Sequence, residues 1–373
     1  MTNFLPAVLL AATPHNGKSV LAYLLSRELR QRRVPHILLR AAPDGEGDWF
    51  YESPDEVRIA LRRKGTFNAR LVADMRRAIQ NRRLPMLVDI GGRPQGEQFD
   101  ILTDCTHVIH LFRDDNDRAV SGAWLEPLNL IPVAELQSQL KGDDVLRQDN
   151  GILRGVITAL DRGNPRPGVV FARLVERVTG LFAYTEDELE ALHCRDLPDD
   201  TVLVTAAALA SRLNAFAADG SPQFEPSHLA RLPGLVGKSP AIALYGRMPM
   251  WLVAGIAALT APAQLYWFDA RHYGWVMVPS VRRQAHGRHR EFSLTPQAEG
   301  DAIRLVYARQ PGITVLSSPR SVKAPQLPTE AGVILDGPMP GWLWAALARA
   351  YRRHPWLAAR EPRHGDVRFW PLP

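Results

Sequence analysis

Residues 6–19 read PAVLLAATPHNGKS, and this stretch decides the fold of the first half of the chain. Residues 6–11 form a continuous apolar run with the length of a strand that is buried on both faces. From Ser19 onward, valine and leucine recur with the spacing of one helix face, and arginine and glutamate fill the other face. The order of strand, loop and helix predicts an α/β domain with a parallel, doubly wound sheet and helices on both of its faces.

The loop at residues 12–19 matches the phosphate-loop pattern GxxxxGK[ST] at its last three positions and departs from it at the first, where Ala12 stands. In this pattern the glycine lets the backbone approach an anion, the lysine neutralises phosphates, and the serine ligates Mg²⁺. The alternative is a helix that merely begins with a lysine. We expect ATP and Mg²⁺ to bind here, at His15, Asn16, Gly17, Lys18 and Ser19.

Further apolar runs predict more strands of the same sheet, and two of them end beside polar residues. Asp89 follows the run at 86–88, where a carboxylate beside the phosphate loop would hold Mg²⁺ through water. The alternative for Asp89 is a turn residue. Arg113 follows the run at 106–112, where it would reach a phosphate or lie on the surface. Two other predicted strands cover residues 36–40 and 169–174.

An acidic loop, PDGEGDW at residues 43–49, follows the second predicted strand. Ligands in doubly wound sheets bind at the carboxyl ends of the strands. Asp44 or Asp48 would accept a proton from an acceptor hydroxyl in phosphoryl transfer, the alternative being a solvated turn. The site predicts ATP binding with either hydrolysis or phosphoryl transfer, and the loop does not decide between them.

Length and composition limit the class of protein. The 373 residues exceed the roughly 250 to 300 that one core accommodates, so two or three domains are expected. A formal net charge of +6 favours polyanionic partners.

The sequence also predicts where the protein is located. The two cysteines are too few for a disulfide framework and do not have the spacing of metal ligands. No signal peptide precedes the first strand, so we expect a cytoplasmic location. The apolar run at 251–261 ends at Pro262, short of the ~20 residues that a bilayer requires, so no membrane partner is expected.

The second half of the chain repeats itself. Residues 241–252 read AIALYGRMPMWL and residues 332–343 read GVILDGPMPGWL, so both carry G-x-M-P-x-W-L after an apolar run. An apolar helix and a strand ending in an acid-x-arginine-histidine step are expected to follow in each copy, at 269–272 and 361–364. Each copy therefore predicts a strand-helix-strand-strand unit of the split βαβ or ferredoxin-like kind, and two such units can pack as a pseudo-dimer.

The acid and the arginine of each step are two residues apart. On an extended strand they would point to the same face, where they pair with each other or meet a ligand together. The first copy lies beside a basic segment at 282–290, which would supply donors to phosphate groups. A boundary rich in glycine and proline, at about 219–240, separates a first domain at 1–225 from repeat units at 239–310 and 311–373.

The second half of the chain resembles the CRISPR-associated ring nuclease family. Members of this family occur alone or fused to an AAA-type ATPase domain. The resemblance rests on GRMPMWL at 246–252, on FDAR at 268–271, on GWVMV at 274–278, and on the matching residues of the second copy. The first half is similar to the fused ATPase or kinase-like partner, through PHNGKS at 14–19, PDGEGDW at 43–49 and RRKG at 62–65.

The resemblance implies a function. Members of the family bind cyclic tetra-adenylate as a ferredoxin-like dimer and linearise it with Mn²⁺ or Mg²⁺, so a homo-oligomer and an adenylate or RNA ligand are expected. The family's histidine, late in the helix, has no counterpart in the first copy, and His354 is the remaining candidate. The positions that inherit the ligand-binding and catalytic roles are Asp269, Arg271, Glu361 and Arg363.

Three functions follow as expectations. The first is a CRISPR accessory protein that joins an ATP-dependent kinase or ATPase domain to a ring nuclease. The second is a nucleotide or RNA kinase whose second half only binds the acceptor. The third is a sensor that binds a cyclic oligoadenylate without cleaving it.

Overall fold

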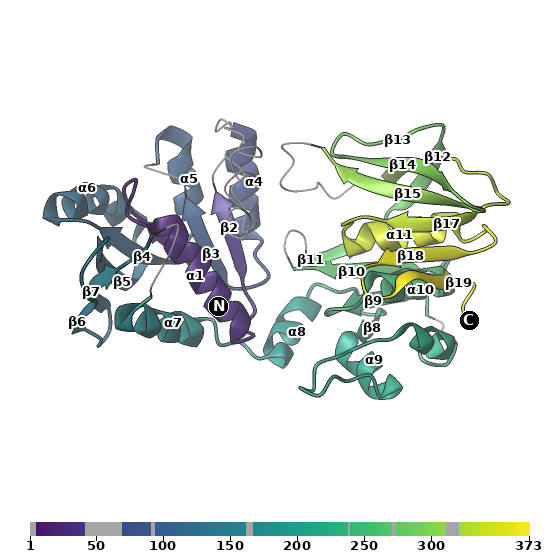
Figure 1. The fold of residues 1–373 in the computed structure, drawn as a ribbon, viewed down its shortest axis with the longest axis horizontal. Helices are drawn as coiled ribbons and strands as arrows, with labels where there is room; N and C mark the ends of the chain where they lie inside the picture. Colours follow the sequence, from purple (N-terminus) through teal and green to yellow (C-terminus); the bar gives the residue numbers. More distant parts are fainter. Residues whose placement is uncertain are drawn as a thin grey trace. The chain divides into compact units, whose positions relative to one another are not determined.

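The chain forms two compact units, which divide after His193. Its structure is a computed structural model that describes residues 5–41, 69–90, 94–161, 167–237, 239–270, 274–310 and 321–373. The two units are described one at a time below (Figure 1). Within these ranges no helix combines the length and apolar character needed to cross a membrane.

The first unit is built on a seven-stranded sheet in the order β2-β3-β1-β4-β5-β7-β6. Every neighbouring pair is parallel except β6 and β7, which are antiparallel. The strands are β1 (Ala7–Ala11), β2 (Ile37–Ala41), β3 (Met86–Ile90), β4 (His107–Phe112), β5 (Ile131–Gln139), β6 (Val145–Gln148) and β7 (Leu153–Thr158). The helices are α1 (Lys18–Gln31), α4 (Ala69–Gln80), α5 (Phe99–Leu102), α6 (Asp115–Leu125), α7 (Val169–Leu181) and α8 (Glu186–Cys194).

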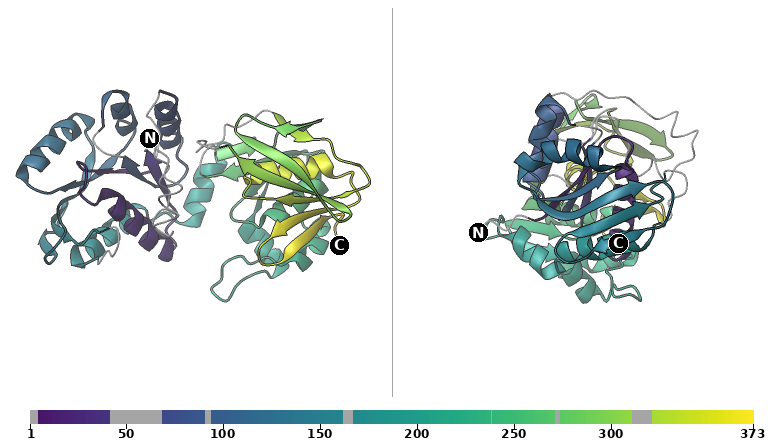
Figure 2. Two further views of the ribbon diagram at one scale, coloured as in Figure 1. Left: turned by 45° about the horizontal axis from the view of Figure 1, so that its top comes forward. Right: turned by 90° about the vertical axis from the view of Figure 1, so that its left-hand side faces the viewer.

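Strand β1 is buried on both faces, as its continuous apolar run predicts. Val8 and Leu10 belong to a core that includes α1 and α7. The alternate residues Ala7, Leu9 and Ala11 belong to a second core that includes α4, α5 and part of α6. The helices therefore cover both faces of the sheet (Figure 2), and the predicted mixed α/β fold with parallel strands is confirmed.

The position of β1 in this order locates the polar end of the sheet. It lies between β3 and β4, so the loop after β1 is flanked by the carboxyl ends of both strands. In parallel sheets ligands bind outside these ends, where the strand order reverses. The fold thus brings the loop at 12–17 beside the end of β3.

The strand predicted at 169–174 is wrong, because these residues begin helix α7. The buried side chains of α7 are Val170, Phe171, Leu174, Val175 and Val178, which is the spacing of one helix face. A short apolar run carries no clear period, so its first six residues did not distinguish a strand from a buried helix. The sheet is instead extended by β5, β6 and β7.

The second unit contains four-stranded, two-stranded and six-stranded sheets, ordered β11-β10-β9-β8, β12-β16 and β13-β14-β15-β17-β18-β19. Its helices are α9 (Ala206–Leu213), η3 (Pro226–Gly234), α10 (Met250–Thr260) and α11 (Gly341–Tyr351). Its strands are β8 (Val202–Thr205), β9 (Ala241–Tyr245), β10 (Gln264–Asp269), β11 (Gly274–Met277), β12 (Ser280–Gln284), β13 (Gly287–Arg288), β14 (Phe292–Glu299), β15 (Ala302–Arg309), β16 (Ser321–Pro325), β17 (Gly332–Asp336), β18 (Leu357–Glu361) and β19 (Gly365–Trp370).

The sequence repeat is a structural repeat. β9-α10-β10-β11 and β17-α11-β18-β19 have the same order, with the first two strands parallel and the last two antiparallel. In each copy the two parallel strands are direct neighbours, so the predicted split βαβ arrangement, which needs a strand between them, is corrected to a simple βαβ unit with one added strand. The positive φ of Gly246 (93°) and Gly337 (114°) explains why both copies keep this glycine.

The two copies share one hydrophobic core. Helices α10 and α11 pack against each other, and each also packs against strands of the other copy, α10 on β18 and β19 and α11 on β10. Their side chains are buried nearly all round, as expected for helices enclosed by other elements.

The second unit begins earlier in the chain than the linker predicted at 219–240. Strand β8 pairs with β9 in parallel, and the buried side chains of α9 belong to the core of the repeats. Residues 194–225 therefore belong to the second unit and not to the predicted first domain at 1–225.

One close approach inside this core yields a stability prediction. A Cβ added to Gly341, the first residue of α11, would fall well inside van der Waals contact with the indole of Trp267 on β10. Because Trp267 is itself packed in the core, Gly341→Ala is expected to destabilise the protein by about 1–3 kcal/mol. Denaturant unfolding checks this value, with Gly234→Ala as the control, since a Cβ at Gly234 meets nothing within 4 Å. Equal stability of the two variants would contradict the packing described here.

Candidate functional site

The loop between β1 and α1 contains a glycine in a left-handed conformation and leads directly into the helix. Gly17 lies in the left-handed region, at φ 74°, and a Cβ there would come within 2.7 Å of the Cβ of Leu160, so only glycine fits. Helix α1 begins directly after it, without a side-chain cap and without an acidic residue in its first turn. The positive end of the helix dipole therefore remains available to a negatively charged group. His15 is exposed, at φ 67°.

Lys18 and Asp89 meet at the start of α1. The Lys18 side chain is 7% exposed, and its ammonium donates a hydrogen bond to the carbonyl oxygen of Ile90. Burial lowers the pKa of Lys18, and the nearby carboxylate of Asp89 opposes that shift. The predicted neighbourhood of phosphate-loop lysine and β3 carboxylate is thus present in the structure.

The two carboxylate oxygens of Asp89 have different surroundings in the described part of the chain. Its Oδ2 accepts a hydrogen bond from Nη1 of Arg40 at 3.2 Å, on the neighbouring strand β2. Its Oδ1 is buried and has no hydrogen-bond partner among the described residues. A buried carboxylate oxygen without a donor suits a hydrated Mg²⁺ ion, which takes oxygen ligands and keeps several waters. Arg40 was not singled out in the sequence.

The loop is held in place by a residue that the sequence analysis missed, Asp117 in the first turn of α6. Its Oδ1 accepts from the Thr13 hydroxyl at 2.5 Å, and its Oδ2 accepts from the Asn16 amide at 2.7 Å. Asn16 also donates to the Thr13 hydroxyl at 2.9 Å. The backbone N–H of Arg113 donates to the same Oδ2 at 2.9 Å.

This network joins the loop at 12–17 to the end of β4. Burial raises the pKa of Asp117, but the hydrogen bonds from Thr13, Arg113 and Asn16 together outweigh it and leave the pKa below its usual range. Arg113 is exposed, and its Nε is 3.6 Å from the Asp117 carboxylate, which binds the loop. The only signal in the sequence is the pair Asp114 and Asp117 at a helix start, where Asp114 caps α6.

The remaining predictions for this half have different outcomes. The side chain of Ser19 is partly buried in the first turn of α1. Asp44 and Asp48 lie outside the described residues. In the described part of the chain, no group of three or more His, Cys, Asp or Glu side chains is arranged to hold a metal ion by itself.

In the repeat, Asp269 and Glu361 end the equivalent strands β10 and β18, as predicted. The prediction that the acid and the arginine lie on one extended strand is wrong for the second copy. The Glu361 carboxylate accepts hydrogen bonds from the backbone N–H groups of Arg363 at 2.8 Å and His364 at 3.1 Å, because the chain turns directly after β18. Arg363 is exposed in that turn. Arg271 lies outside the described residues.

The two copies differ on the face of the sheet that points away from the core. The first copy has an aromatic cluster there, formed by Tyr245, Phe268 and Trp275, with ring centroids 5.0 to 6.0 Å apart. The equivalent positions of the second copy are charged, with Arg360 donating to Asp366 at 2.8 Å and Arg304 donating to Asp336 at 2.7 Å. The pairing of Phe268 with Trp275 and of Arg360 with Asp366 in register establishes the equivalence.

Arg349, near the end of α11, binds the last turn of α10. Arg349 donates to the Ala257 carbonyl at 3.0 Å and to the Thr260 hydroxyl at 3.1 Å, so it satisfies the last turn of α10. Burial, with a smaller contribution from Arg352, lowers the pKa of Arg349 to about 10. His354 is 4% exposed, and its Nδ1 is 3.0 Å from the carbonyl oxygen of Ala331.

Comparison with known proteins gives one result for this unit. Residues 316–367, which cover β16 and the second copy from β17 into the first half of β19, match the sequence family of a CRISPR-associated protein, Cas_csx3. No curated protein matches the chain significantly. The matched segment links the second unit to CRISPR systems.

Proposed function

We propose that this protein is a CRISPR accessory protein in which the first unit binds ATP with Mg²⁺ and the second unit binds a cyclic oligoadenylate such as cyclic tetra-adenylate. The single observation that carries the CRISPR assignment is the family match at residues 316–367. The ATP assignment is supported by the convergence of Lys18 and Asp89 at the start of α1.

The first unit offers each group that a triphosphate needs. The N–H groups at the start of α1 face the anion, the Lys18 ammonium would exchange the Ile90 carbonyl for phosphate oxygens, and Arg113 would approach the same group from the end of β4. Ser19 and Asp89 would hold Mg²⁺, which supplies charge neutralisation at the phosphates. Whether the phosphate passes to water or to an acceptor depends on residues such as Asp44 and Asp48.

In the second unit we assign ligand binding to the first copy. Adenine bases stack on aromatic side chains, and the cluster of Tyr245, Phe268 and Trp275 lies directly beside Asp269. The same positions in the second copy are neutralised by ion pairs, and Glu361 is engaged by backbone amides. These contacts favour a structural role for Glu361 and, given its burial, for His354.

The described residues around Asp269 do not form a cluster of three metal-binding side chains. Binding without cleavage is the second candidate function, and the burial of His354 is the observation that favours it.

Trp275→Ala tests the assignment of the first copy. It is expected to weaken binding of labelled cyclic tetra-adenylate by about 1–3 kcal/mol per stacked base, roughly five- to a hundredfold. Asp366→Ala, at the equivalent position of the second copy, is the matched control and should lower stability while leaving messenger affinity unchanged. Equal affinities of the two variants would refute the assignment.

The reaction itself is tested by incubating labelled cyclic tetra-adenylate with the protein and Mn²⁺ or Mg²⁺, with and without ATP. A linear product that disappears in Asp269→Asn supports a ring nuclease. Retention of intact ligand supports a sensor, and transfer of labelled phosphate from ATP to a product supports a kinase.

A further inference from the structure

Several exposed cations lie on and just after the paired strands β12 and β16. We call this group the basic corner; it consists of Arg282, Arg288, Arg290 and Lys323. Among the described residues, none of these side chains makes an ion pair. By contrast, Arg304 and Arg360, on the adjoining six-stranded sheet, both bind carboxylates. The only carboxylate in residues 280–291 is Glu291, which is 2% exposed.

Two of these cations face each other directly. Strands β12 and β16 are parallel, and Arg282 is in register with Lys323. The preceding pair in that register is Val281 and Val322, with Val322 fully buried, so the two cations lie on the outward face. Like charges opposite each other on neighbouring strands are destabilising. A polyanionic ligand that contacted both side chains would relieve this repulsion.

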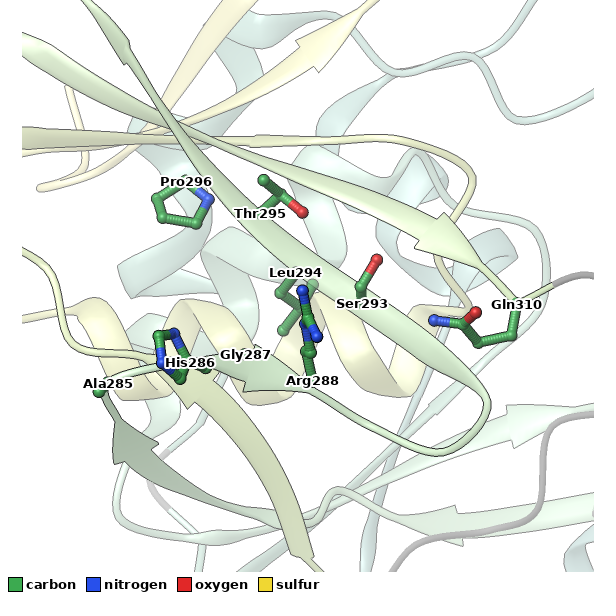
Figure 3. A pocket seen from close by; sticks show the side chains of 9 residues that line it. All are labelled: Ala285, His286, Gly287, Arg288, Ser293, Leu294, Thr295, Pro296 and Gln310. Carbon is green, nitrogen blue, oxygen red and sulfur yellow. The ribbon is translucent and has the colours of Figure 1, made fainter.

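The basic corner borders a hollow with polar walls. His286 and Arg288 on the β13 side and Ser293, Thr295 and Gln310 on the β14 and β15 side line it. Figure 3 shows Arg288 lying across the strand of Ser293, with His286 to one side and Gln310 to the other.

The backbone of this hollow is fixed by close packing. A Cβ on Gly287 would approach Cδ of Pro325 to 2.5 Å and the Leu294 carbonyl oxygen to 2.7 Å, so β13 fits tightly between β14 and β16. The donors of Arg288 and its neighbours are thus presented from a rigid frame, which reduces the entropy lost on binding.

An imidazole stacked on an aromatic ring lies at the end of the same hairpin. The ring of His289 is partly exposed and stacks on Phe292, at 4.6 Å between centroids and 16° between planes. An unpaired base could stack on the imidazole of His289. The bases of a duplex are already stacked and paired, so they are not available for this contact.

From these features we propose that the basic corner and its hollow bind the phosphate backbone of single-stranded RNA. Several unpaired cations supply the attraction to phosphates, the neutral side chains of the hollow supply hydrogen bonds, and His289 supplies a stacking surface. Single-stranded RNA is favoured over an acidic lipid surface because none of the described residues that line the hollow is a large exposed apolar side chain. The inference does not depend on ATP or cyclic oligoadenylate binding.

Lys323→Glu tests the proposal because it should change stability and binding in opposite directions. It replaces a repulsive pair with an Arg282–glutamate pair, so Tm is expected to rise. Binding of a fluorescein-labelled single-stranded RNA of about 12 nucleotides, within the site sizes of single-strand binding folds, is expected to weaken about tenfold. The slope of log affinity against log salt should become shallower by about 0.7 for each phosphate that the variant no longer neutralises.

Lys141→Glu is the control, since it makes the same charge change at an exposed position of the first unit. Arg288→Gln is a second variant in the hollow and is expected to weaken RNA binding like Lys323→Glu. The proposal is overturned if Lys323→Glu binds RNA as Lys141→Glu does, or if the wild type prefers vesicles of acidic phospholipid to RNA. Lys18→Ala should bind the RNA normally, which separates this test from the proposed ATP site.

Discussion

Lys18→Ala is expected to weaken ATP binding by roughly ten- to a hundredfold, because a hydrogen bond to a charged partner contributes about 1.5–3 kcal/mol. Lys18 is the cation at the start of α1, and it is 7% exposed beside Asp89. Its ammonium donates to the carbonyl oxygen of Ile90 and lies near the carboxylate of Asp89. Triphosphate oxygens would accept charge-assisted hydrogen bonds from this ammonium, and the alanine variant loses them.

Isothermal titration with ATP and Mg²⁺ measures the loss, and Lys141→Ala serves as the control for removal of an exposed lysine. Burial of the Lys18 ammonium opposes folding, as its lowered pKa indicates, so the variant is expected to keep or raise its Tm. A loss of binding therefore would not be explained by unfolding. Unchanged ATP affinity in Lys18→Ala would remove the basis of the nucleotide site.

Asp117→Ala is expected to destabilise the first unit by about 3 kcal/mol or more, since each buried donor left unsatisfied costs about 1–3 kcal/mol. The donors are the Thr13 hydroxyl, the Asn16 amide and the Arg113 backbone N–H. Thr13 and Asn16 are buried, so water does not readily replace the carboxylate. ATP affinity should fall as well, because the hydrogen bonds that fix Thr13 and Asn16 in the loop are then missing.

The pH dependence of Asp117 has a defined sign. Its pKa in the folded protein is below the unfolded value, which is about 3.9. The carboxylate therefore contributes stability that is complete above that value and is lost as the pH falls through the folded pKa. The stability difference between wild type and Asp117→Asn should be constant above about pH 4 and shrink below it.

Chemical denaturation across this pH range measures both effects. Asp115→Ala is the matched control, because Asp115 is an exposed acid in the same turn of α6. It should cost only the helix-dipole contribution, about 0.3–1 kcal/mol. Equal losses for the two variants, or a difference that does not respond to acid, would show that the network at Asp117 does not hold the loop.

The sequence predicted the central part of the first unit well and its edge poorly. The burial of β1 on both faces follows from an uninterrupted apolar run, and the loop and helix follow from local residue chemistry. The start of α7 was misread because six residues, five of them apolar, are too few to resolve a period. Asp117 was missed because its partner Thr13 is 104 residues away in the chain, and no local pattern encodes such a contact.

Ala12 illustrates the same limit. The missing first glycine of the phosphate-loop pattern leaves the loop with less backbone freedom, and the structure provides side-chain hydrogen bonds from Thr13 and Asn16 to Asp117 instead. In the second unit, internal repetition predicted the equivalent elements. It did not predict that their two parallel strands are neighbours, or that the outer faces differ, because strand pairing and side-chain partners depend on contacts distant in the sequence.

Each repeat packs against elements of the other, and Arg349 of the second copy donates hydrogen bonds to the last turn of α10 in the first. This arrangement has an evolutionary consequence. Neither half retains a complete interior when the chain is cut between them, so both must be inherited together. In a symmetric pair of identical chains, any substitution alters both halves at once. A tandem chain removes that constraint, which allows one half to keep a ligand surface while the other becomes its permanent support.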